Sequence, residues 1–156
     1  GPIVQFSDRF FISHYVSVPE AGLYNVGYQI GISVGLITFA FNQSFVPYLY
    51  EMLTQITYAI RVKIVKFSYL FMLGFLIIVL LLWLITPFIY RYFIDPKFYD
   101  SIKYVWIIGL GSSFGGMYYL VVNYIFFEKK TKVLAIITFS NALLSIALNY
   151  FLVRKY

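Results

Sequence analysis

Polar side chains that could bind a ligand recur at helical spacing inside two otherwise apolar stretches. The first stretch carries Ser112, Gly116, Tyr119 and Asn123, and the second carries Thr138, Asn141, Ser145 and Asn149. Steps of three and four residues keep side chains on one face of an α-helix. Because an unpaired amide in hydrocarbon is costly, each face must contact either other helices or a water-filled cavity. The spacing leaves both alternatives open.

A charged pair near the start of the chain is a second candidate for chemistry. Asp8 and Arg9 lie in a mostly apolar segment, and charges within a spanning helix often mark ion pairs or transport pathways. A guanidinium can bind a phosphate through two hydrogen bonds. The alternative is that the pair lies at the outer interface, with the side chain of Arg9 reaching toward water. His14 is interpreted as a polar interface residue.

Two further sets of residues lie in the next apolar stretch. Gly27, Gly31 and Gly35 recur every fourth residue, which predicts a flat stripe where a neighbouring helix packs closely. Asn42 and Gln43 follow near the end of the stretch, where amides could line a cavity or cap the span.

Catalytic and metal-binding patterns are not found in the sequence. The carboxylates are few and scattered, no zinc-protease, serine-hydrolase or phosphate-loop motif occurs, and the chain has no cysteine. No metal site and no cofactor is predicted. Asp95, in an outer loop that contains a proline, is expected to shape a turn.

The distribution of charge determines the fold class. Hydrophobic residues make up 62% of the 156 residues and charged residues 12%, too few to cover a water-facing surface. Residues 21–50, 67–90, 104–127 and 133–153 contain no Asp, Glu, Lys or Arg. About 20 helical residues cross the hydrocarbon core, and backbone groups in lipid need internal partners. We therefore predict an all-α, polytopic integral membrane bundle.

The predicted elements follow from these runs. The expected spans are residues 1–18 (the later part of a helix that begins upstream), 22–46, 67–91, 103–127 and 132–153. Residues 48–66 are too polar to span. They are expected to form a helical extension at the cytoplasmic interface followed by a bend, or else a solvated loop.

Basic residues cluster in two of the connecting segments. Arg61, Lys63 and Lys66 lie in one segment, and the second segment, residues 128–132, is Glu-Lys-Lys-Thr-Lys. The positive-inside rule places both in the cytoplasm. Because these cations flank apolar spans, we expect them to meet anionic membrane lipid and not nucleic acid.

Several short motifs in the same order resemble a known family. The motifs are Asp-Arg-Phe-Phe-Ile-Ser at 8–13, Ala-Gly-Leu-Tyr at 21–24, Pro47, Thr-Pro-Phe-Ile at 86–89 with Tyr-Asp-Ser at 99–101, and Glu-Lys-Lys-Thr at 128–131 before Leu-Asn-Tyr-Phe-Leu at 148–152. Together they resemble O-antigen polysaccharide flippases of the multidrug/oligosaccharidyl-lipid/polysaccharide superfamily. One departure is the outer loop, which reads Ile-Asp-Pro-Lys-Phe at 94–98 where the family often has a glycine.

The resemblance implies a MATE-like transporter of two six-helix halves around a central cavity, in the bacterial cytoplasmic membrane. This chain would be about four and a half helices of the second half, with the other half as its partner. The family flips undecaprenyl-pyrophosphate-linked oligosaccharides by alternating access, coupled to an ion gradient such as H⁺ or Na⁺.

Roles for individual residues follow as hypotheses from that substrate. Arg9 would bind the pyrophosphate and Asp8 would couple to the ion. The residues expected to bind the sugar are Asn42, Gln43, Asn123, Asn141 and Asn149. The alternatives are an exporter of drugs or of peptidoglycan precursors, a membrane-embedded glycan-assembly enzyme, or a scaffold subunit.

Overall fold

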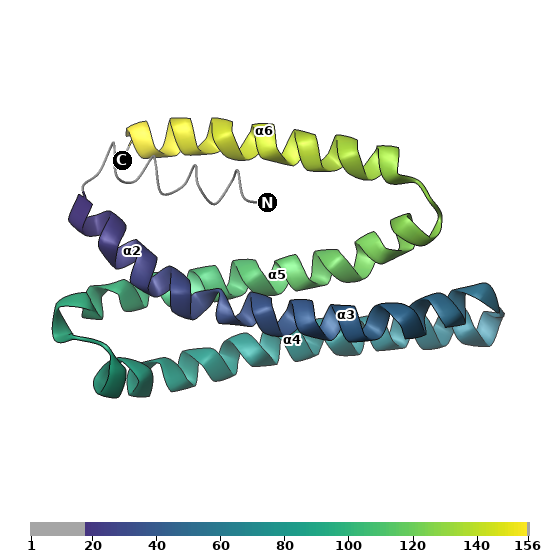
Figure 1. Cartoon of the computed structure of the whole chain (residues 1–156), viewed down its shortest axis with the longest axis horizontal. Coiled ribbons are helices and arrows are strands. Elements are labelled where there is room, and N and C mark those ends of the chain that lie inside the picture. Colours follow the sequence, from purple (N-terminus) through teal and green to yellow (C-terminus); the bar gives the residue numbers. More distant parts are fainter. Residues whose placement is uncertain (1–17, 156) are drawn as a thin grey trace.

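The protein consists of long helices that run back and forth along one direction (Figure 1). The structure is a computed structural model that describes the backbone of residues 18–155 and the side chains of residues 18–148. The predicted partial span at 1–18, with Asp8, Arg9 and His14, lies almost entirely outside the described residues.

The helices begin and end at turn and cap residues. They are α2 (Val18–Gly31), α3 (Ser33–Thr54), α4 (Tyr58–Phe93), the 3-10 helix η1 (Pro96–Ser101), α5 (Ile102–Phe127) and α6 (Thr131–Lys155). In the described part of the chain, four helical stretches are long and apolar enough to cross a membrane: Val18–Thr54, Tyr58–Phe93, Pro96–Phe127 and Thr131–Leu148. They contain the predicted spans at 22–46, 67–91 and 103–127 and most of the span at 132–153.

Helices α2 and α3 follow each other without a loop and form one bent rod (Figure 1). They are interrupted only at Ile32, where the ladder continues from the Ile32 amide to the Tyr28 carbonyl at 2.9 Å and from the Leu36 amide to the Ile32 carbonyl at 3.2 Å. The combined stretch has 37 residues, or about 55 Å at 1.5 Å per residue, against about 30 Å of hydrocarbon. The rod is therefore longer than the hydrocarbon core is thick.

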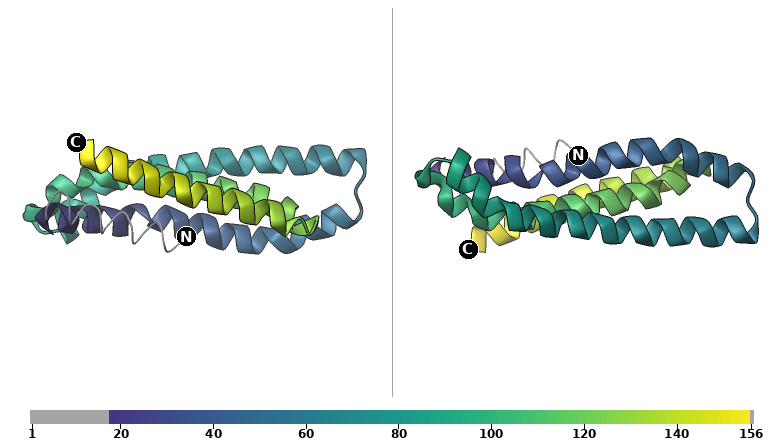
Figure 2. Two further views of the ribbon diagram at one scale, coloured as in Figure 1. Left: turned by 90° about the horizontal axis from the view of Figure 1, so that it is seen from above. Right: turned by 90° about the horizontal axis from the view of Figure 1, so that it is seen from below.

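The segment at 48–66 has the predicted helical extension followed by a bend. It is helical except for a bend at residues 55–57, so the solvated loop is wrong. Its two parts extend α3 and α4 as a hairpin that reaches beyond the α5–α6 turn (Figure 2). Packing explains the hairpin, since Leu49 and Met52 are buried in one cluster with Ile64. The Thr57 hydroxyl caps α4 by accepting a hydrogen bond from the Ile60 amide.

The core lies among α3, α4 and α5. Its buried cluster contains Phe45, Leu49, Met52, Ile64, Phe75 and Leu120. Phe71 of α4 fits between two rings of α3, with ring centroids 4.4 Å from Phe41 and 4.9 Å from Phe45. This packing joins the three helices into one unit.

The turns place the basic segments at one end of the bundle. The α3–α4 turn and the α5–α6 turn lie at the same end, and η1 lies at the other (Figure 1). The α3–α4 turn lies next to Arg61, Lys63 and Lys66, and the α5–α6 turn lies next to Lys129, Lys130 and Lys132. The arrangement agrees with the predicted alternation of loops. At the opposite end Asp95 shapes the turn as expected, because its carboxylate accepts a hydrogen bond from the Lys97 amide at 3.1 Å.

Candidate functional site

A seam of small residues joins the α2–α3 rod to α5. A Cβ on Gly27 would lie 2.6 Å from the Ser101 carbonyl oxygen, and one on Gly31 would lie 2.7 Å from that of Val105. These positions leave no room for any side chain larger than hydrogen. The predicted role of the glycine stripe in helix packing is confirmed.

The seam continues along α3 in the same direction. Gly35 faces Ser112, and a Cβ on Gly116 would lie 2.6 Å from the Cβ of Thr38. Residue numbers rise together on both sides, so the first and third long stretches run parallel. Two membrane spans must run in the same direction when one span between them, here α4, returns the chain across the membrane.

The seam contains a buried amide pair. The Nδ2 of Asn123 on α5 donates a hydrogen bond to the Oδ1 of Asn42 on α3 at 2.7 Å, and the two residues are 7% and 4% exposed. In this conformation they hold two helices together and do not line an open cavity, so their sugar-binding assignment is corrected. For Asn123, the structure shows a contact with another helix and not a water-filled cavity, which were the two alternatives for this face of α5.

The rest of the α5 face also meets α3. Ser112 packs against Gly35, and the ring of Tyr119 lies edge-on to that of Phe39 with centroids 6.0 Å apart. Gln43 is exposed, because consecutive residues on a helix point about 100° apart and its neighbour Asn42 occupies the seam. The structure therefore does not bring Gln43 together with the buried pair.

Helix α6 has a different environment. Thr138 and Asn141 are exposed, Ser145 is half-buried, and the side chain of Asn149 lies outside the described residues. Within Thr131–Leu148 no residue is buried, and α6 packs mainly on α5 near the turn before diverging from it (Figure 1). The polar face of α6 thus has no cover from α2 to α5.

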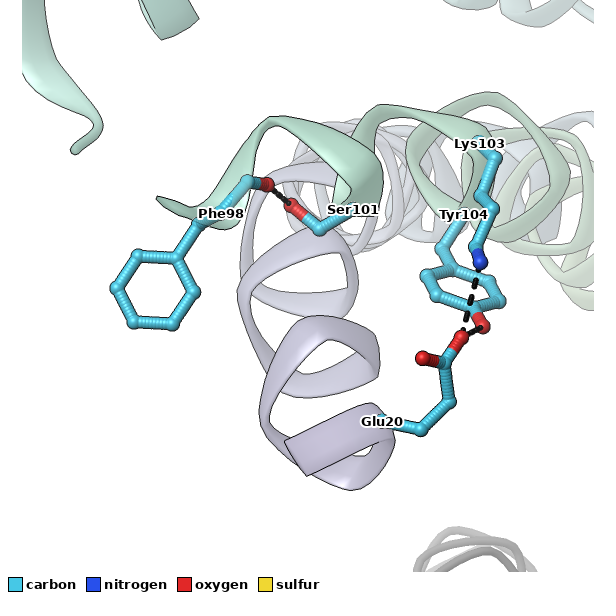
Figure 3. A network of polar contacts seen from close by, with 5 residues as sticks. All are labelled: Glu20, Phe98, Ser101, Lys103 and Tyr104. Atoms are coloured by element: carbon cyan, nitrogen blue, oxygen red, sulfur yellow. Dashed lines mark hydrogen bonds and ion pairs between the residues drawn. The ribbon is translucent and has the colours of Figure 1, made fainter. Parts of the chain in front are cut away.

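A polar cluster that the sequence did not reveal lies at the η1 end (Figure 3). The carboxylate of Glu20 accepts hydrogen bonds from the Lys103 ammonium at 2.9 Å and the Tyr104 hydroxyl at 2.5 Å. It joins the start of α2 to the start of α5. The partners are more than eighty positions apart in the chain, so no local pattern links them.

A second contact at this end is buried. The Ser101 hydroxyl donates to the Phe98 carbonyl at 2.6 Å, so the Tyr90 hydroxyl must donate to the Ser101 oxygen, 2.5 Å away. Both residues are fully buried. The bond fixes the end of α4 against the turn that leads into α5.

The predicted site residues lie neither in the two clefts between α4 and α5 nor in a cluster of metal ligands. Two apolar clefts between α4 and α5, of about 460 and 500 Å³, share Trp83 and Trp106 and include none of the predicted residues. Among residues 18–148, no group of three or more His, Cys, Asp or Glu side chains is placed to hold a metal ion.

Comparison with known proteins supports the membrane assignment. The chain is 36% identical over 128 residues to an uncharacterized membrane protein of Haemophilus influenzae, covering 80% of this chain and 31% of that protein. It is 31% identical over 129 residues to Lsg locus putative protein 1 of the same organism, covering 82% and 32%. The chain thus spans about a third of the length of these relatives.

No family model matches the chain, and no solved structure matches it. The long apolar helices and the similarity to a protein named as a membrane protein establish the coarse assignment. The chain is an all-α integral membrane protein.

Proposed function

We propose that the protein, at its full natural length, flips undecaprenyl-pyrophosphate-linked oligosaccharides across the bacterial cytoplasmic membrane by alternating access. The chain described here would contribute part of a MATE-like second half. The other half, the lipid-linked glycan and bilayer lipid would be its partners, and an H⁺ or Na⁺ gradient its source of energy.

The observation that carries this proposal is the exposed polar face of α6. Thr138 and Asn141 lie in a helix that is apolar enough to span a membrane, yet α2 to α5 do not cover them. Polar side chains within spanning segments usually face the bundle interior or a water-filled cavity. A path for sugars would supply such a cavity, since amides and hydroxyls hydrogen-bond to glycan hydroxyls.

The seam supports the same proposal in another way. In alternating access, one bundle rocks against another as a largely rigid body around the substrate site. The close glycine contacts and the buried Asn42–Asn123 bond make the α2–α3 rod and α5 one such body. Their role in transport would be to keep the wall of the cavity rigid.

The resemblance to O-antigen flippases supplies the substrate. A pyrophosphate headgroup needs cations, for which Arg9 is the candidate, and Asp8 is the candidate for ion coupling. Asn141 and Asn149, with Gln43 as an exposed amide on α3, remain candidates for contacts with sugar.

The test is complementation in a strain that lacks the gene. The Asn141→Leu variant should lower surface polysaccharide by about tenfold, the equivalent of a little over 1 kcal/mol, while lipid-linked oligosaccharide accumulates on the inner leaflet. Ser140→Leu is the matched control, because Ser140 is an exposed polar residue that points about 100° away on the same helix. Membrane levels of both variants should equal those of the wild type.

Three outcomes would contradict the proposal. Normal surface polysaccharide in the deletion strain would show that the protein is not the flippase. Loss of polysaccharide with no build-up of the lipid-linked precursor would favour a glycan-assembly enzyme, and export of drugs or peptidoglycan precursors would favour the related exporters.

The charged pair is tested separately. Arg9→Ala should reduce surface polysaccharide, and Asp8→Asn should change the dependence of transport on external pH or Na⁺. If Arg9→Ala leaves polysaccharide unchanged, the pyrophosphate assignment fails. Transport by the Asp8→Asn variant that matches the wild type at every pH and Na⁺ concentration would exclude ion coupling at Asp8.

A further inference from the structure

A cleft of about 390 Å³ lies at the end of the bundle that holds the basic turns. Its lining comes from the end of α3, the bend that follows, the first turns of α4 and the end of α5. The lining residues are Leu53, Ile56, Arg61, Ile64, Val65, Tyr124, Phe127 and Glu128. The cleft is separate from the α6 face and from every residue assigned to the flippase substrate.

The walls of the cleft are mostly apolar. Ile56 and Val65 are 47% and 53% exposed, and Ile64 beneath them is buried. Tyr124 turns its hydroxyl toward Ser68, at 3.3 Å. A wall of this kind favours a hydrocarbon chain over a water-soluble ligand.

The rim of the cleft carries an available cation. Arg61 is exposed, and among residues 18–148 no carboxylate lies within ion-pair distance of its guanidinium. The carboxylate of Glu128 would repel an anion, but it lies 3.6 Å from the Lys130 ammonium, which offsets its charge. The cleft therefore presents one uncompensated guanidinium beside an apolar wall.

The surroundings extend this positive field. The cations at this end are Arg61, Lys63, Lys66, Lys129, Lys130 and Lys132, against the carboxylates Glu51 and Glu128. Basic pockets between spanning helices are a recurrent feature of sites for anionic lipid headgroups. The cleft lies at one end of the long apolar helices, where we expect lipid headgroups.

We propose that this cleft binds one anionic phospholipid of the bilayer, with its phosphate on Arg61 and an acyl chain against Ile56, Val65 and Phe127. The guanidinium donates two hydrogen bonds to the phosphate oxygens, which a single ammonium cannot do in the same geometry. The bound lipid covers the apolar surface that the α3–α4 hairpin leaves open. The proposal does not depend on the flippase function.

The test is lipid binding to the full-length protein in detergent, measured by native mass spectrometry. Phosphatidylglycerol and phosphatidylcholine with identical chains are titrated against the wild type, Arg61→Gln and Arg91→Gln. Arg91 is the matched control, because it is an exposed arginine at the other end of the same helix. The wild type should bind phosphatidylglycerol about tenfold more tightly, and Arg61→Gln should remove that preference whereas Arg91→Gln keeps it.

Further measurements make the outcome decisive. Arg61→Lys should restore part of the preference, and thermal melting should show that all variants fold. Equal affinity of the wild type for the two lipids would overturn the proposal, as would an unchanged preference in Arg61→Gln. Competition by millimolar inorganic phosphate would also overturn it, because the cleft would then be a site for a free anion and not for a lipid.

Discussion

Asparagine occurs on both sides of the bundle, in two opposite environments. On the seam, Asn42 and Asn123 are buried and bonded to each other, and glycines on both sides allow the helices to approach closely. On α6, Asn141 lies on an exposed face that no described helix covers. Both regions lie in helical stretches long enough to span a membrane, so the difference comes from the neighbours and not from the residue type.

The contrast separates a structural use of polarity from a functional one. A buried amide that finds a partner stabilises one arrangement of two helices, because separating the helices would leave both groups unpaired in a nonpolar environment. An amide without such a partner on a spanning helix needs water, a ligand or another helix. The seam therefore holds α2, α3 and α5 together. The polar face of α6 needs a partner that α2 to α5 do not supply.

The largest effect is expected from enlarging a seam glycine. Gly116→Leu should destabilise the protein by about 3 kcal/mol, because its Cβ would already lie 2.6 Å from that of Thr38. Gly115→Leu is the control, since no other atom lies within 4 Å of a Cβ built there. Unfolding by SDS titration measures both. Equal destabilisation of the two variants would show that close packing is not what holds the seam.

An intermediate effect is expected from the amide pair. Asn123→Leu should cost about 1 to 3 kcal/mol, because the Asn42 amide is left buried without a partner. The double variant with Asn42→Leu should cost less than the sum of the single variants, with a coupling of about 0.6 to 1.7 kcal/mol. A double-mutant cycle on unfolding free energies measures this coupling. Strict additivity would mean that the hydrogen bond contributes nothing.

The smallest effect on stability is expected at the other end of the bundle. Tyr90→Phe should cost about 1 kcal/mol, because it removes one hydrogen bond while the Ser101 hydroxyl keeps its bond to the Phe98 carbonyl. Ser101→Ala should cost more, since the buried Tyr90 hydroxyl then loses its acceptor. The reverse order, measured by the same titration, would contradict the assigned donor and acceptor.

The sequence predicts the helices well, because the spans depend on composition alone. The charge-free runs predicted the helical stretches, and the basic residues predicted that the α3–α4 and α5–α6 turns lie at the same end of the bundle. The spacing of Gly27, Gly31 and Gly35 predicted the packing stripe. Spacing also placed Ser112, Gly116 and Asn123 on one face.

The environment of each face was harder to predict. Spacing shows which residues share a face but not what the face meets, so Asn42 and Asn123 were assigned to a substrate path when they bond to each other. The contact of Glu20 with Lys103 and Tyr104 was missed because it joins distant parts of the chain. The extension and bend at residues 48–66 were predicted, but the packing of Leu49 and Met52 with Ile64 was not, because it joins two segments of the chain.

The most direct test of the contrast is the reactivity of single cysteines toward a water-soluble, membrane-impermeant maleimide. The 156 residues contain no cysteine, so each introduced thiol reports on one position in this chain. In the full-length protein, with any cysteines elsewhere in it replaced, Asn141→Cys and Thr138→Cys should react rapidly, because only a hydrated thiol ionises readily.

The comparison positions lie on the opposite face of α6 and in the seam. Leu143→Cys and Ile136→Cys, about 160° and about 140° from Asn141 on the helix, should react slowly in lipid, and Asn42→Cys should be protected in the seam. Fast labelling of the Asn141 face alone is the predicted result. Protection of that face at the level of Asn42→Cys would contradict the account, because α6 would then be packed by the rest of the protein as the seam is.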